Sequence, residues 1–228
     1  MALPSIFSRI SAKLALMSGL GIFMVVAMLV TGWQTNRMVT ASSNLERQQL
    51  IISRDLVDAK ASVRGMQIGT HELRLARTKD DAAKAADYLR ERHHSMIKYL
   101  DSAMSALTIQ VNRDRVQTIK ALAEGYFATA GELAKVIETK LGAANDTGLG
   151  DTEENLRSSL LETAGKMTKT LDEGVEVAKG RADQASVDMD AAQSLAQTLN
   201  LGVGVLVVVT LPRQPCSERE ASPARSAG

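Results

Sequence analysis

The sequence is poor in cysteine, proline and aromatic residues. Its 228 residues include one cysteine, Cys216, so neither an internal disulfide nor a cysteine-based zinc site can form. Aromatic residues make up 3% of the chain, which disfavours a sandwich or barrel, because strands are enriched in aromatic and β-branched residues. The four prolines, together with abundant Ala, Leu, Met, Gln, Lys and Glu, favour helices. We therefore expect an all-α fold.

Charge and motifs exclude several classes of function. The formal net charge is +1, so the chain has no excess of basic residues for phosphate contacts, and no nucleic-acid partner is expected. The chain contains no G-x-S-x-G, Walker A or glycine-rich nucleotide motif. His93 and His94 are adjacent and lack the i, i+4 spacing of a helical zinc site. We therefore expect no enzyme, no cofactor and no metal.

Two charge-free stretches predict transmembrane helices. The first holds 23 uncharged residues between Lys13 and Arg37, and about 20 apolar residues suffice to cross a bilayer. A cleaved signal peptide is the alternative, but the stretch runs on to Trp33 without an A-x-A-like cleavage site. The second, 191–212, is strongly apolar only over 201–211, so it spans a membrane only with residues 192–200 included; otherwise it is a buried helix.

Basic residues flank both stretches on the outer sides. Arg9 and Lys13 precede the first, and Arg213, Arg219 and Arg225 follow the second, which places both termini in the cytoplasm by the positive-inside rule. The predicted order is a cytoplasmic N-terminus, a transmembrane helix, an external domain, a second transmembrane helix and a disordered cytoplasmic tail, over 1–13, 14–34, 35–195, 196–212 and 213–228.

The residues between the two stretches show the alternating steps of four and three that mark a coiled-coil seam. Four such sets predict four helices, with seam residues Ile52, Leu56, Ala59, Val63, Met66, Thr70, Leu73 and Arg77; Leu89, His93, Met96, Leu100, Ala103 and Leu107; Val116, Ile119, Ala123, Tyr126, Ala130, Leu133 and Ile137; and Leu160, Ala164, Met167, Leu171, Val175, Ala178, Ala182, Ala185, Met189, Ala192 and Ala196.

Turn signals separate these sets. Thr78 followed by Asp81 is a helix-capping pattern, and the glycine-containing segment 142–150 is the clearest break. A turn near residue 110 has no such signal, but a single helix over 81–141 would be about 90 Å long and have no partner of that length. In the fourth set, the steps Met167 to Leu171 to Val175 interrupt the alternation. The predicted architecture is an up-down four-helix bundle between two transmembrane helices.

The chain resembles the sensor half of a bacterial methyl-accepting chemotaxis receptor with a four-helix-bundle periplasmic domain. The resemblance covers residue 1 to about 210 and is carried by the basic start SRISAKLALMSGLGIF, the first hairpin VDAKASVRGMQIGTHELRLARTKDDAAKAADYLRE and the second span LNLGVGVLVVVT. It implies a two-pass protein of the inner membrane, a homodimer, that senses a small molecule and signals across the membrane. In place of the family's cytoplasmic signalling region stands LPRQPCSEREASPARSAG, so we expect a truncated or frame-shifted receptor.

Arginines are the candidate ligand-binding residues, because a guanidinium binds carboxylates in a bidentate manner, as a sensor of amino acids or organic acids requires. In the aspartate-sensing relatives arginines lie at n, n+5 and n+9; starting from Arg64 these positions are Gly69 and Leu73, so the motif is not reproduced. Pairing of a seam arginine with Glu153 or Glu154 is the structural alternative. The candidate site consists of Arg64, Arg74 and Arg77 on the first helix and Arg157, Ser159 and Thr163 on the fourth.

Two other functions fit the same pattern. The bundle could be the sensor part of a histidine kinase, which can use the same type of domain. It could also be a membrane-anchored helical bundle that pairs with other proteins and does not signal.

Overall fold

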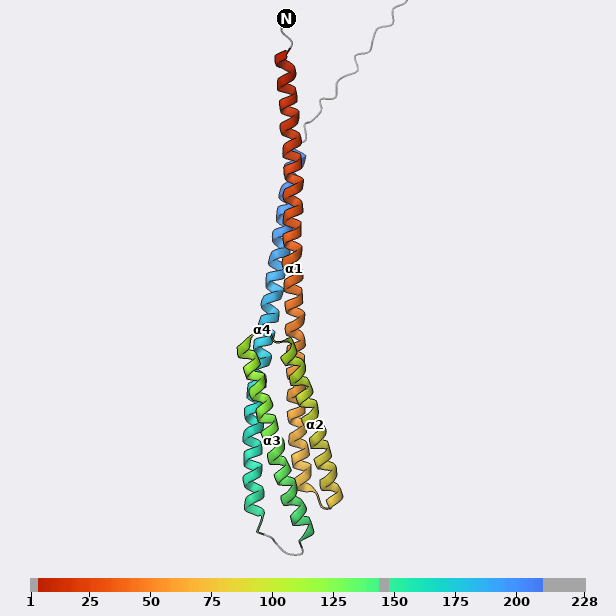
Figure 1. Ribbon diagram of the computed structural model, residues 1–228, viewed down its shortest axis with the longest axis vertical. Helices are drawn as coiled ribbons and strands as arrows, with labels where there is room; N and C mark the ends of the chain where they lie inside the picture. The colour runs from red at the N-terminus through yellow and green to blue at the C-terminus, as the bar shows by residue number, and fades with distance from the viewer. Residues whose placement is uncertain (1–3, 144–147, 211–228) are drawn as a thin grey trace, which may run out of the picture. The chain divides into compact units, whose positions relative to one another are not determined.

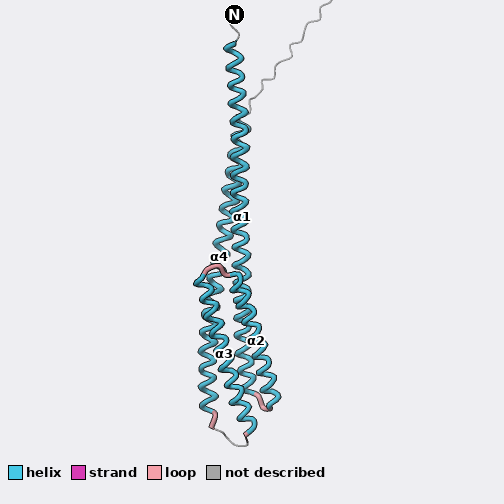
Figure 2. Tube along the Cα trace, in the orientation of Figure 1, coloured by secondary structure: helices cyan, strands magenta, loops and turns pink. Residues whose placement is uncertain are grey.

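The computed structural model describes residues 4–143 and 148–210, and it is all-helical over them, as predicted. The four helices are α1 (Pro4–Leu75), α2 (Lys79–Ala106), α3 (Gln110–Gly142) and α4 (Gly150–Thr210), joined by short loops (Figures 1 and 2). The chain forms two compact units. One comprises Ala41–Met189, and the other comprises Met1–Thr40 with Asp190–Gly228.

The unit Ala41–Met189 holds one hydrophobic core to which all four helices contribute. Contacts between the helices show their directions: Gly69 of α1 lies against Leu89 of α2, and Gln48 of α1 donates a hydrogen bond to the carbonyl of Ala106 near the far end of α2. Sequence position thus rises along α1 as it falls along α2, which makes the pair antiparallel. The predicted up-down arrangement of this hairpin is confirmed.

The predicted seams form the core. Every seam residue from Ile52 to Leu73, and every one from Val116 to Ile137, is buried. The exception on the first helix is Arg77, which lies beyond the end of α1 and is exposed. Burying a large aliphatic side chain is worth about 1.5–3 kcal/mol, so these seams provide most of the driving force for packing. The largest fully buried side chains are Tyr126, Ile52, Met66, Leu73, Met96, Leu100, Ile119, Leu133, Met167, Leu171 and Val63.

The two helix starts differ in their capping, which explains why the sequence predicts one turn more clearly than the other. Thr78 caps α2 by accepting a hydrogen bond from the Asp81 amide at 3.1 Å, as predicted. The turn between α2 and α3 lies where length considerations place it, but Ile109 at the start of α3 provides no side-chain cap. Arg113 supports this turn instead, because its Nε donates to the Leu107 carbonyl at 2.9 Å. This contact spans six residues and is not one of the usual helix-capping patterns, so the sequence does not signal the turn.

The fourth seam differs from the prediction at three positions, because Val175, Met189 and Ala196 are only half-buried. Gly174, and not Val175, is the buried residue that follows Leu171, so the alternation of four and three continues to Ala178. Two successive steps of four occur one turn later, from Gly174 to Ala178 to Ala182. The reason is packing: a Cβ built on Gly174 would lie 3.0 Å from Cδ1 of Leu56, so α4 approaches α1 closely here.

The predicted transmembrane helices lie in the unit that contains the chain ends, and here the structure differs from the prediction. No helix in the described part of the chain is long and apolar enough to cross a membrane, so the predicted two-pass inner-membrane location is wrong. Among the described side chains of α1, the uninterrupted apolar run covers residues 22–30. Such a run is about 14 Å long, roughly half of a hydrocarbon core. The side chains of residues 203–210, and all of the predicted tail 213–228, lie outside the described residues.

Candidate functional site

A cavity of about 190 Å³ lies between α1 and α4 in the unit Ala41–Met189, near the C-terminal end of α1 and the N-terminal end of α4. Helix α1 contributes four polar side chains to its lining, α3 contributes one tyrosine, and α4 contributes one arginine and two leucines. The lining residues are Gln67, Thr70, His71, Arg74, Tyr126, Arg157, Leu160 and Leu161.

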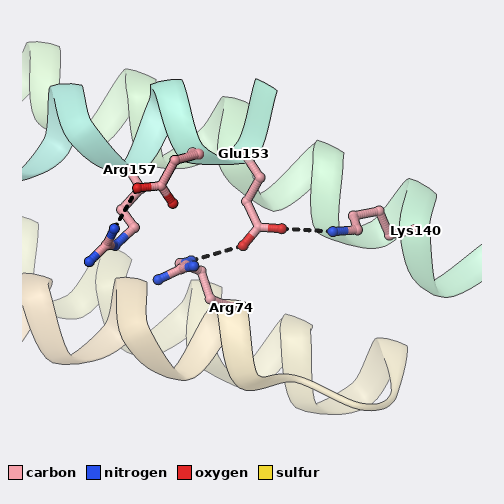
Figure 3. Close-up of polar contacts among 5 residues, drawn as sticks. Arg74, Lys140, Glu153 and Arg157 are labelled. Atoms are coloured by element: carbon pink, nitrogen blue, oxygen red, sulfur yellow. Dashed lines mark hydrogen bonds and ion pairs between the residues drawn. The ribbon is translucent and has the colours of Figure 1, made fainter. Parts of the chain in front are cut away.

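Arg74 is held by an ion pair with α4 (Figure 3). Its Nε lies 2.9 Å from Oε1 of Glu153, and Lys140 of α3 lies 2.8 Å from the other carboxylate oxygen. The hydrogen bond from Lys140, followed by that from Arg74, lowers the pKa of Glu153 below its usual value, although burial opposes this. Glu153 is therefore ionised at neutral pH, and its 13% exposed side chain joins three helices at the edge of the cavity.

Arg157 is the second guanidinium at the cavity. Its Nη1 pairs with Glu154 one turn earlier on α4, at 2.5 Å, and its side chain is 41% exposed. Figure 3 shows Arg74 and Arg157 reaching toward the same region from facing helices. An i, i+3 pair on a helix surface contributes only about 0.2–0.5 kcal/mol, so this contact orients the guanidinium without holding it firmly.

The buried side of the cavity is formed by a hydroxyl pair. Thr70 Oγ1 donates to the carbonyl of Met66 at 2.8 Å and lies 2.8 Å from the hydroxyl of Tyr126. Either hydroxyl can be the donor in the second bond, because each carries one hydrogen and can also accept. Burial raises the pKa of Tyr126, which keeps the phenol protonated. Both residues line the cavity, and a hydroxyl oxygen can accept a hydrogen bond from a ligand.

The structure brings together two of the six predicted site residues, Arg74 and Arg157. Arg64 lines a separate, more open groove between α1 and α4. Arg77 is exposed beyond the end of α1, because α1 ends at Leu75. Ser159 is exposed and Thr163 half-buried, and neither lines the cavity. The alternative role, an ion pair between an arginine of α1 and Glu153 or Glu154, is also found. Arg74 forms this pair with Glu153, whereas the predicted seam residue Arg77 does not.

Sequence reasoning missed Gln67, Thr70, His71 and Tyr126 as lining residues. Thr70 and Tyr126 were assigned to the seams, and they are indeed buried there. A signal was available, since polar atoms at two seam positions of different helices must find partners when buried.

Two other clusters in the unit, around His93 and around Arg64, differ from this site. His93 stacks on Phe127 with ring centroids 4.4 Å apart, and burial lowers the pKa of His93. The groove that Arg64 lines also contains Lys169 and three carboxylates, so its charges largely offset one another. Within the described residues, no group of three or more His, Cys, Asp or Glu side chains is placed to hold a metal ion.

Comparison with protein-family models, with curated proteins and with solved structures finds no match.

Proposed function

We propose that this chain is the sensor part of a chemotaxis-receptor-type signalling protein, and that the unit Ala41–Met189 binds a small anionic ligand in the Arg74–Arg157 cavity. The observation that carries the proposal is the meeting of two guanidiniums from two helices, α1 and α4, at one cavity whose lining also includes other polar side chains. The sequence resemblance supports the same class of function.

Physical chemistry favours a small carboxylic acid as the ligand. A hydrogen bond from a guanidinium to a carboxylate is worth about 1.5–3 kcal/mol, roughly twice a neutral one. The other two guanidinium nitrogens of Arg74 have no partner among the described residues, so they remain available to a ligand. Sites for drug-sized molecules measure about 300–1,000 Å³, so a cavity of about 190 Å³ fits a smaller metabolite.

The floor of the cavity narrows the choice further. The acceptor lone pairs of Thr70 and Tyr126 complement an N–H or O–H donor, and the amide of Gln67 can serve as donor or acceptor. The cavity thus offers guanidinium donors from Arg74 and Arg157 and hydroxyl acceptors from Thr70 and Tyr126. These groups suit a ligand with a carboxylate at one end and an ammonium or hydroxyl group at the other. An amino acid or a hydroxy acid has this arrangement.

The position of the cavity offers a route for a signal. Its two arginines lie on α1 and α4, the helices that continue from this unit into the other. A ligand that contacts both helices more favourably in one arrangement than in another shifts the equilibrium between them, by an amount equal to its differential affinity. We propose that ligand binding changes the relative position of α1 and α4 in this way.

A second copy of the chain is the proposed partner, bound through the outer face of α1. This outer stripe repeats the steps of four and three on the side of α1 opposite to the core seam, and its apolar members are about half exposed or more. A coiled coil with an identical helix buries such a stripe. The residues of the outer stripe are Leu50, Arg54, Val57, Ala61, Arg64, Ile68, His71 and Leu75.

The outer stripe also favours one alternative, a helical bundle that pairs with other coiled-coil proteins and binds no ligand. A thermal-shift screen of amino acids and organic acids on the full-length chain separates the two functions. Arg74→Ala should weaken binding of a hit about ten- to a hundredfold, since each 1.4 kcal/mol is a factor of ten.

Arg90→Ala is the matched control, because Arg90 also pairs with one carboxylate, Asp87, but lies on the exposed surface of α2. It should bind the hit like the unaltered chain. A screen in which no acid raises the unfolding temperature, or a hit that Arg74→Ala binds normally, would reject the proposed site.

A further inference from the structure

Both guanidiniums at the cavity already have an acidic partner on α4. Arg74 pairs with Glu153, and Arg157 pairs with Glu154, so the two positive charges at the cavity face two negative ones. Lys140 adds one positive charge, on the side of Glu153 away from Arg74 (Figure 3). The cavity therefore offers many N–H donors but little excess positive charge.

Geometry keeps the carboxylate of Glu153 in place when a ligand binds. Glu153 contacts Arg74 at Nε, so the end of the guanidinium that bears the two terminal nitrogens stays accessible. Lys140 and Arg74 hold one carboxylate oxygen each, and the side chain is largely buried. A ligand carboxylate can then bind Arg74 beside Glu153 without displacing it.

We infer that Glu153 determines which ligand charge the cavity accepts: a molecule with one carboxylate binds better than a molecule of the same shape with two. The inference rests on the proposed ligand-binding function and goes beyond it. The first carboxylate gains the charge-assisted hydrogen bonds of Arg74. A second carboxylate finds both arginines already paired with Glu153 and Glu154, so it adds a negative charge with no free cation to offset it, and the fixed charge of Glu153 repels it.

Succinate and succinamate provide a matched pair of probes, because replacing one carboxylate by an amide preserves the shape and removes one charge. Each probe is titrated against the full-length chain by isothermal calorimetry. The unaltered chain should bind succinamate more tightly than succinate. Glu153→Gln, which keeps the size of the side chain and removes its charge, should shift the affinity ratio toward succinate about fivefold, or about 1 kcal/mol.

Two further variants make the test specific. Glu162→Gln is the matched control, because the exposed Glu162 also pairs with a cation on α4, but this cation, Lys166, does not line the cavity; the variant should leave the ratio unchanged. Glu154→Gln removes a half-exposed charge without touching buried contacts. It should shift the ratio in the same direction by about twofold, since solvent screens its charge more strongly. If Glu153→Gln does not fold, Glu154→Gln therefore still tests the charge selection.

The outcomes separate this inference from the proposed function. Tighter binding of succinate by the unaltered chain, or an equal effect of Glu153→Gln on both probes, would overturn the charge selection. If Arg74→Ala then still weakens the binding of both probes, the proposed ligand site is supported although the charge selection is wrong. If neither probe nor any acid of the screen binds the unaltered chain or Glu153→Gln, both proposals are wrong.

Discussion

The outer stripe of α1 predicts a weak, symmetric dimer whose strength can be worked out from exposure. Its four large apolar side chains, Leu50, Val57, Ile68 and Leu75, are 52%, 47%, 52% and 63% exposed in the single chain. Full burial of such a side chain is worth about 1.5–3 kcal/mol, so burying the exposed half gives about 1 kcal/mol each. Two copies together gain about 8 kcal/mol, against an association cost of roughly 4–15 kcal/mol.

This balance predicts a dissociation constant of about 1 mM or weaker, because a net gain of about 4 kcal/mol corresponds to 1 mM. The two arginines of the stripe, Arg54 and Arg64, weaken the pairing further while they fix its register. Ile68→Glu should remove the contribution of two side chains, about 2 kcal/mol, and so lower the association constant about thirtyfold.

Disulfide trapping is suited to so weak an association. In a Cys216→Ser background, Val57→Cys places one thiol on the stripe, where a parallel dimer brings the two copies of residue 57 together. The yield of cross-linked dimer under mild oxidation should fall strongly when Ile68→Glu is added. Val111→Glu is the matched control, because Val111 is 67% exposed on α3, away from the stripe.

Equal cross-linking with and without Ile68→Glu would refute this reasoning. An equal loss on adding Val111→Glu would do the same, since the effect would then come from surface charge in general and not from the stripe.

Two predictions concern the stability of the unit Ala41–Met189. Gly174→Leu should lower the free energy of unfolding by about 1–3 kcal/mol in denaturant titration, because even a Cβ there lies 3.0 Å from Leu56 Cδ1. Gly180→Leu on the same helix has open space and should be neutral or stabilising, and a loss equal to that of Gly174→Leu would contradict the packing argument. The second concerns pH: because the folded-state pKa of Glu153 is lowered, its contribution is complete above its usual pKa of 4.5 and is lost as pH falls through the folded value. The unfolding temperature of Glu153→Gln should therefore depend less steeply on pH in that acidic range, and parallel curves would show that the ion pairs of Glu153 do not stabilise the fold.

The core was predictable because helix geometry converts burial into spacing. A residue every three or four positions returns to the same face, so the seams on α1 and α3 could be read directly. On α2, the predicted seam residue His93 is only half-buried, and the buried Ala82 and Ala85 were not predicted. Gly174 on α4 was missed because the seams were identified from apolar side chains, and glycine has no side chain. It is buried because the neighbouring helix approaches closely at this position. Such a position is set by the neighbouring helix, here through Leu56, and not by the local sequence.

The candidate site was predictable only in part, for a related reason. Arg74 and Arg157 were found because their chemistry suits carboxylates wherever they lie. Arg77 failed although the cap at Thr78 already implied that α1 ends before it. The contact between Thr70 and Tyr126 joins residues 56 positions apart, and its form depends on the distance between α1 and α3. Periodicity gives the face on which a residue lies, but not its partner across the bundle.

Helix α1 connects the three features on which the proposals depend. Its inner face carries the core seam, one flank carries Gln67 and Arg74 at the cavity, and its outer face carries the stripe. His71 belongs both to the stripe and to the cavity lining, so the two proposed binding events share a side chain. Linkage then requires reciprocity: if a ligand binds the dimer more tightly than the monomer by some factor, it tightens the dimer by the same factor per site. A dimer near the millimolar range leaves room for such tightening, because coupling of about 1–3 kcal/mol changes its association constant about five- to 150-fold. The small apolar area of the stripe, a weakness for stability, is thus what would make the dimer responsive to a ligand.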